Sequence, residues 1–149
     1  MEREKGIPIQ EELVEVKRGR VIRPCFFAAY TRKAGERAAL GRWGEWLALR
    51  YLRRSGWDVV ARNWSCRVGE VDLIAYGPHH LGFFEVRTRR GPSSVRPEET
   101  ADEEKLARVE AAAWHFLRRY ELEEQPFGLH LIAVETPDLR RYELRHWRL

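Results

Sequence analysis

Small and apolar side chains recur at steps of three and four between residues 34 and 54, which is the spacing of one helical face. The positions on this face are Ala38, Gly41, Gly44, Glu45, Ala48 and Leu52. Because most of these side chains are small, the pattern predicts a helix that lies close against a sheet. Gly56 follows the segment, and glycine is common just beyond the end of a helix.

Three short segments rich in β-branched and aromatic residues come next, and such segments are typical of strands. They cover residues 57–63, 70–76 and 81–87. Between the last two stands Gly77-Pro78-His79-His80, a sequence typical of a turn. The pattern therefore predicts that the second and third strands form a hairpin, with both histidines as turn residues and not as metal ligands.

The remaining pattern predicts a second helix and two more strands. Thr100 and Glu103 have the spacing of a capping box, at the start of a helix that ends near residue 120. Residues 127–135 and 140–148 have the composition of strands. The elements follow the order α-β-β-β-α-β-β, which predicts an α/β fold with a mixed central sheet flanked by helices.

Residues 1–33 mix charges with proline and glycine and show no sustained period. They are predicted to form a poorly ordered or loosely docked N-terminal arm, ahead of one domain over residues 34–149. Within the arm, Ile9, Leu13 and Val16 have the spacing of a short helical turn.

The final predicted strand carries Tyr142, Leu144 and Trp147. If this strand lies at the edge of the sheet, it can pair with a second copy and form a homodimer. The alternative is an edge that is covered within the monomer.

Composition narrows the class of protein only a little. A length of 149 residues suits one domain with its own core. Lysine and arginine number 27 against 23 acids, a net charge of +4 that favours a polyanionic partner only weakly over a mildly basic soluble protein. Arginine greatly outnumbers lysine, which suits phosphate recognition, although a GC-rich coding sequence produces the same bias.

The cysteines and the apolar segments indicate a cytoplasmic protein. Cys25 and Cys66 lie far apart and have no CxxC partner, so reduced thiols are expected rather than a zinc site. The longest apolar segment near the N-terminus, residues 25–30, is too short for a membrane span or a signal peptide.

The predicted hairpin brings two carboxylates together. If residues 77–80 form the loop, Tyr76 pairs with Leu81, and the same register places Asp72 opposite Glu85. Directly opposed side chains have Cβ atoms about 4.5–5.5 Å apart. The same register places Glu70 opposite Arg87, so that all four side chains share one face of the hairpin.

Two facing carboxylates repel each other, and a positive group is expected between them. One candidate is a divalent cation, because Mg²⁺ is commonly held by one or two carboxylates together with water and phosphate. The other is Arg87, which can neutralise the cluster as part of an ordinary cross-strand ion-pair network. For Glu70, a salt bridge with Arg87 is preferred to a metal-binding role.

Three segments with a specific relative spacing add a further indication. They are Gly41-Arg42-Trp43-Gly44-Glu45, Gly69-Glu70-Val71-Asp72-Leu73-Ile74-Ala75 and Phe83-Phe84-Glu85-Val86-Arg87-Thr88-Arg89. Together they resemble the signature blocks of the YraN-like family, bacterial proteins similar to archaeal Holliday-junction resolvases. The resemblance covers about residues 35–120 and implies a restriction-endonuclease-like fold of the PD-(D/E)XK nuclease superfamily.

The resemblance also implies roles for individual residues. Asp72 and Glu85 match the acids that hold Mg²⁺ or Mn²⁺, and Glu45 matches a helix glutamate that completes the catalytic site. Arg87 stands where the motif has a lysine; it keeps the positive charge but cannot act as a base. Lys105, on the second helix, is a candidate to substitute for that lysine in space.

Basic residues beyond the third strand are candidates for phosphate contacts. Arg89, Arg90 and Arg96 follow the predicted active strand, and Lys105 lies on the next helix. The competing interpretation of the arginines is a solvated loop, and the sequence favours neither.

The resemblance therefore implies a metal-dependent nuclease that cleaves phosphodiesters of nucleic acid, with DNA, branched DNA included, as the expected partner. One alternative is a catalytically inactive nucleic-acid-binding module of the same fold. A second is a protein-interaction domain in which the acidic cluster is structural. The sequence leaves the substrate and the oligomeric state open.

Overall fold

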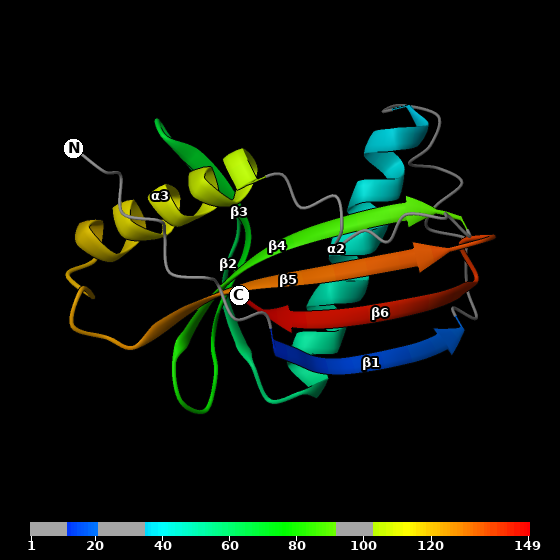
Figure 1. Cartoon of the computed structure of the whole chain (residues 1–149), viewed down its shortest axis with the longest axis horizontal. Helices are drawn as coiled ribbons and strands as arrows, with labels where there is room; N and C mark the ends of the chain where they lie inside the picture. Colours follow the sequence, from blue (N-terminus) through cyan, green and yellow to red (C-terminus); the bar gives the residue numbers. More distant parts are fainter. Residues whose placement is uncertain (1–11, 21–34, 92–102) are drawn as a thin grey trace, which may run out of the picture.

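The computed structural model describes residues 12–20, 35–91 and 103–149. Its elements are β1 (Glu12–Arg20), α2 (Glu36–Arg54), β2 (Asp58–Cys66), β3 (Gly69–Tyr76), β4 (Leu81–Arg90), α3 (Glu103–Arg119), β5 (Phe127–Thr136) and β6 (Arg141–Arg148). The strands form one six-stranded sheet in the order β1-β6-β5-β4-β3-β2 (Figure 1). The β4–β5 pair is parallel and the other neighbours are antiparallel. The predicted mixed sheet and restriction-endonuclease-like α/β fold are confirmed, with one strand more than expected.

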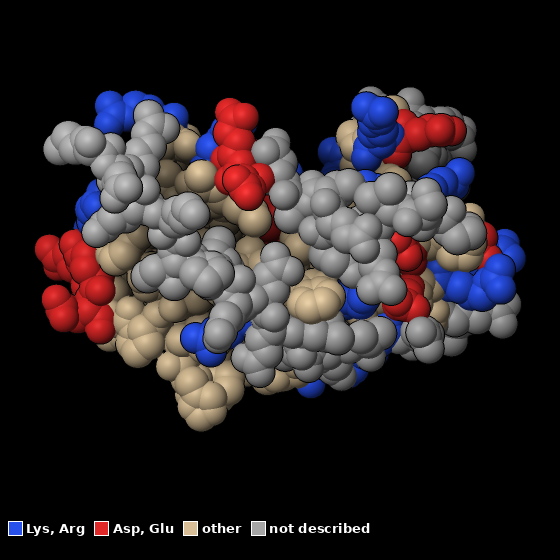
Figure 2. Space-filling model, in the orientation of Figure 1, with Lys and Arg blue, Asp and Glu red and all other residues tan. Residues whose placement is uncertain are grey.

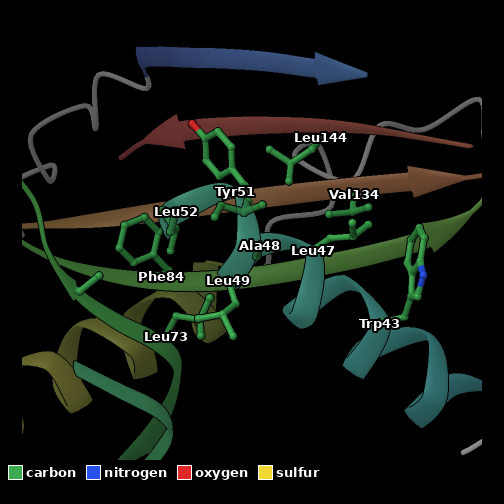
Figure 3. Packing of buried hydrophobic residues seen from close by; sticks show 12 residues of the cluster. Trp43, Leu47, Ala48, Leu49, Tyr51, Leu52, Leu73, Phe84, Val134 and Leu144 are labelled. Atoms are coloured by element: carbon green, nitrogen blue, oxygen red, sulfur yellow. The ribbon is translucent and has the colours of Figure 1, made fainter. Parts of the chain in front are cut away.

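The two helices cover opposite faces of the sheet, because they pack against alternate residues of the same strand. Phe84 of β4 belongs to the core beneath α2, whereas its neighbour Phe83 belongs to the core beneath α3. In Figure 1, α2 passes behind the sheet and α3 lies in front of it. Figure 3 shows Leu47 and Ala48 of α2 directed towards Val134 and the other strand residues of the first core.

Gly44 explains why α2 carries a face of small residues. A Cβ atom at this position would lie 1.7 Å from the Thr88 hydroxyl oxygen of β4, a distance that no side chain tolerates. Glycine therefore lets the helix approach the strand closely. The predicted helix end is also confirmed, because Gly56 follows it with φ 86°, a left-handed conformation that favours glycine.

Strand β1 corrects the prediction of a loosely docked arm. Glu12–Arg20 pair along their length with β6, so this part of the arm belongs to the sheet, and Leu13 and Val16 lie in a strand rather than a helical turn. A register shift between Leu13 and Glu15 interrupts the strand. Such a bulge breaks the period of two that identifies a strand in a sequence. The other residues of the predicted arm lie outside the described ranges.

Strand β6 lies between β5 and β1 and is not an edge. The prediction that it pairs with a second copy is therefore wrong, and the alternative of an edge covered within the monomer is confirmed. In the part of the chain that the structure describes, no helix is both long and apolar enough to cross a membrane.

Candidate active site at the divergence of β3 and β4

The predicted register of the hairpin is confirmed where the strands are paired. Tyr76 pairs with Leu81 at the turn, and the ladder continues to the pair formed by Leu73 and Phe84. The four-residue loop, residues 77–80, is closed by the Gly77 N–H, which donates to the His80 carbonyl at 2.9 Å.

The ladder ends one pair before the two predicted carboxylates. The Val86 N–H donates to Oδ2 of Asp72 at 2.7 Å, so a side chain takes the place that a main-chain carbonyl occupies in a continuing ladder. Asp72 and Glu85 were predicted to form a ladder pair, and they do not. They lie where β3 begins to separate from β4. Glu70 and Arg87 are likewise not paired, because they lie beyond the end of the β3–β4 ladder. On its other side, β3 still pairs with β2, where Glu70 lies opposite Ser65.

Glu85 is the most deeply buried acid of this region, with 1% of its surface exposed. Its Oε1 lies 2.5 Å from Nζ of Lys105 and 3.8 Å from Nε of Arg87. Both oxygens are buried and accept no hydrogen bond among the described residues, and Oε2 has no ion-pair contact there either. Lys105 and Arg87 therefore meet one oxygen of the carboxylate, and the other oxygen is available for a ligand.

Asp72 titrates near neutral pH. Burial, followed by the nearby charge of Glu85, raises the pKa of Asp72 to about 7. The Val86 N–H and the Lys105 ammonium act in the opposite direction, and Glu45 adds to the increase. Two acids in one buried place thus cannot both ionise at low cost, which is the situation that a divalent cation relieves.

Glu45 approaches the two acids from α2. Its side chain is partly buried, and burial raises its pKa, whereas a hydrogen bond with Asn63 and the charge of Arg62 lower it. Asn63 lies within β2 and has φ 48°, a left-handed conformation that asparagine adopts more readily than most residues. Asn63 was not predicted to belong to the site; an asparagine within a predicted strand was the available signal. Glu45, Asp72 and Glu85 are called the acidic cluster below.

The acidic cluster suits a metal ion held mainly by two carboxylates. Within residues 12–20, 35–91 and 103–149, no three acidic, histidine or cysteine side chains form a group that could hold a metal by themselves. Asp72 and the free oxygen of Glu85 nevertheless fit Mg²⁺, which usually keeps water and substrate oxygens as its other ligands. The part expected of Glu45 in completing the site stays a prediction.

The predicted phosphate-binding residues differ in position and in exposure. Arg89 and Arg90 lie at the end of β4, partly buried and exposed respectively, and Arg96 lies outside the described residues. Lys105 lies against Glu85, where it was a candidate to substitute for the motif's lysine, and its contact with phosphate stays a prediction. Figure 2 shows that, among the coloured residues on this face, basic atoms are spread over the molecule and interspersed with acidic ones. No single basic patch marks a nucleic-acid surface among those residues.

A second buried polar group, called the histidine cluster below, comprises His80, His130, His146 and Tyr51. His80 Nε2 lies 2.8 Å from His130 Nε2, and His130 Nδ1 lies 2.9 Å from His146 Nε2. The Tyr51 hydroxyl completes the series, 2.8 Å from His146 Nδ1. His80 is in the turn, as predicted, but the hydrogen-bonded series across four elements was not foreseen.

Burial lowers the pKa of two histidines of this cluster. The pKa of His130 is lowered to about 2, mainly by burial and further by the neighbouring His146 and His80. Burial also lowers the pKa of His80, as does the charge of Arg148. At neutral pH, His80 and His130 therefore act as neutral hydrogen-bonding groups.

Comparisons with known proteins place the chain in a family. Residues 44–140 match the model of a family described as "Uncharacterised protein family UPF0102". A UPF0102 protein of Roseiflexus castenholzii is 41% identical over 103 residues, which cover 68% of this chain and 83% of the relative. A UPF0102 protein of Nocardia farcinica is 38% identical over 107 residues, covering 72% of this chain and 84% of the relative. The matched region includes both Asp72 and Glu85.

Proposed function

Because the chain belongs to the protein family UPF0102, whose description specifies no activity, we propose its function from the acidic cluster: a metal-dependent nuclease that acts on phosphodiesters of nucleic acid. The resemblance to the YraN-like family is borne out by this membership. The observation that carries the proposal is the pair formed by the partly buried Asp72 and the buried Glu85, at the point where β3 and β4 separate.

Each residue of the site has a distinct part in the proposal. Asp72 and Glu85 would hold Mg²⁺ or Mn²⁺, which supplies a Lewis acid and an activated water when bound. The Val86 N–H fixes one oxygen of Asp72 and thereby aims the carboxylate. Arg87 contributes positive charge beside Glu85 and stabilises the charge that develops on the phosphate, but it does not accept a proton.

A second candidate function is a nucleic-acid-binding module without catalysis. Two observations favour it: an arginine stands at the motif's lysine position, and the described residues include no third metal ligand close to the pair. Such a module would bind nucleic acid with an affinity that falls as the salt concentration rises, and would leave it intact.

Cleavage of end-labelled four-way junctions and linear duplexes in Mn²⁺ tests the proposal. Wild type should cut at least one of these substrates, and Asp72→Ala should reduce the rate by roughly 10²–10⁴-fold, the effect of losing several kcal/mol of metal-based stabilisation. Asp58→Ala is the matched control, because Asp58 is an exposed acid at the far end of β2 and should leave cleavage unchanged.

Arg87→Lys separates the two candidate functions. Cutting by wild type shows that arginine suffices. Cutting only by Arg87→Lys identifies a site that has lost one group and kept its architecture. If neither protein cuts but both bind DNA in a salt-dependent manner, the nuclease proposal is abandoned in favour of the binding module.

A further inference from the structure

Lys105 occupies an unusual place for a lysine. It lies in the first turn of α3, beside Glu103 and Glu104, and the dipole of a helix favours acids rather than cations at that end. Glu104 has its own partner within the helix, because Arg108 approaches it to 2.6 Å. Lys105 instead reaches across to the sheet and contacts Glu85. The helix therefore disfavours a cation at this position, and the contact with Glu85 of the acidic cluster stabilises it.

The two partners of this ion pair differ greatly in burial. The side chain of Lys105 is 45% exposed, whereas that of Glu85 is 1% exposed. Lys105 can withdraw into water at little cost, but Glu85 cannot. A buried carboxylate that loses its counter-ion is strongly destabilising unless another cation replaces it.

The ammonium lies on the same carboxylate that would hold the metal ion, so the two cations would be close neighbours. Nζ of Lys105 lies 2.5 Å from Oε1 of Glu85, and Mg²⁺ binds its oxygen ligands at about 2.0–2.1 Å. Two cations beside one carboxylate in a poorly solvated place repel each other strongly. The charge of Lys105 also acts on Asp72, where it opposes the increase in pKa. Lys105 therefore influences both acids of the proposed metal site.

We propose that Lys105 neutralises the site in the absence of metal and that an arriving divalent cation displaces it from Glu85. The displaced ammonium remains attached to the first turn of α3, with its side chain directed to solvent, and is then available to a phosphate oxygen of the nucleic acid. Metal and nucleic acid consequently bind with positive coupling through Lys105. This inference rests on the proposed function and describes how that site is regulated.

Calorimetric titration of the full chain with Mn²⁺, without nucleic acid, tests the competition. Lys105→Met keeps the length of the side chain and removes the charge, and it should bind Mn²⁺ about tenfold more tightly than wild type, within the usual range of coupling between sites. Lys105→Arg keeps the charge and should remain within about twofold of wild type. Arg108→Met, one helical turn further along, is the matched control and should also remain within about twofold.

DNA binding tests the second half of the coupling. In wild type, Ca²⁺ should increase the affinity for a labelled duplex relative to EDTA, and Lys105→Met should lose most of that increase. Lys105→Gln repeats both measurements in case the methionine variant folds poorly, which thermal unfolding detects.

The outcomes separate this inference from the proposed function. Equal or weaker Mn²⁺ affinity in the Met and Gln variants overturns the competition and leaves the proposed metal site standing. Absence of Mn²⁺ binding by wild type and by the variants alike overturns the metal site, and the inference with it.

Discussion

Two polar clusters, each partly buried, combine one side chain of α2 with side chains of the sheet and its turns, and they meet the cost of burial in opposite ways. In the histidine cluster, each of the three contacts measures 2.8–2.9 Å. One set of neutral tautomers satisfies all three hydrogen bonds. In this set Tyr51 donates to His146, His146 donates to His130, and His130 donates to His80. The cluster carries no charge in this state and needs no ligand.

The acidic cluster is not satisfied in this way. Both oxygens of Glu85 are buried without a hydrogen bond among the described residues, and only one of them has an ion-pair contact. The pKa of Asp72 is raised to about 7 by burial and by Glu85. Native proteins leave few buried polar groups without a partner, and those that they leave are often functional. The comparison teaches that the number of polar groups is less informative than whether they are satisfied.

The largest expected effect comes from Asp72→Asn. Because the folded pKa of Asp72 lies above its ordinary value of 3.8, the stabilisation from this group is present at low pH and is lost as the pH rises from about 4 to about 7. The amide side chain of the variant has no charge to bury, so the variant should be more stable than wild type at pH 8, by on the order of 2–4 kcal/mol. Urea denaturation at pH 8, in EDTA, measures the difference.

Mn²⁺ provides the control for that difference. It should stabilise wild type at pH 8 and have little effect on the Asp72→Asn variant, because a ligand stabilises only the protein that binds it. A variant that is less stable than wild type at pH 8 would show that the acidic cluster is structural, as a protein-interaction domain would require.

The next effect concerns His130 and has the opposite sign. Its folded pKa, about 2, lies below the ordinary value of 6.5, so the unfolded chain takes up a proton that the folded chain does not. Stability should therefore fall as the pH decreases below about 6.5, by about 1.4 kcal/mol per pH unit. Denaturation between pH 4.5 and 8 in the Asp72→Asn background isolates this slope from the opposing one.

His130→Gln in the same background is the matched variant. Glutamine retains hydrogen-bonding groups and does not titrate, so the stability of this protein should depend less on pH. The charged and titratable groups near the cluster, Arg148, His79 and Lys17, are unchanged in both proteins. An unaltered slope would mean that the acid sensitivity originates outside His130.

The sequence predicted the features that depend on neighbouring residues. The register of the β3–β4 hairpin followed from the length of its turn, and Gly56 marked the end of α2. Both are local, because a turn or a cap is determined by a few consecutive residues. The same local logic extended the ladder to Asp72 and Glu85, where it failed because a side chain accepts the Val86 hydrogen bond.

The features that the sequence did not reveal depend on contacts between distant segments. Strand β1 pairs with the last strand of the chain, and its bulge conceals the alternation. His130 lies in the mostly apolar β5 and His146 in the mostly charged β6, and only the packing of β5 beside β6 brings their rings together. Lys105 was a candidate both for phosphate contact and for the place of the motif's lysine, but its contact with Glu85 depends on the position of α3 over the sheet, which the sequence does not show.

The smallest expected effect, from Tyr51→Phe, tests whether the two clusters are independent. The substitution removes the hydrogen bond of 2.8 Å to His146 and retains the ring in the core beneath α2 (Figure 3). It should reduce the free energy of unfolding by about 1 kcal/mol, the usual contribution of one buried hydrogen bond. Mn²⁺ affinity and any cleavage should be unchanged, because the acidic cluster has no contact with the histidine cluster among the interactions described above.

Urea denaturation and Mn²⁺ titration of the same preparation measure both properties. A loss of Mn²⁺ affinity in Tyr51→Phe would show that α2, which carries both Glu45 and Tyr51, couples the two clusters, and the contrast between them would then have to be replaced by a single connected site.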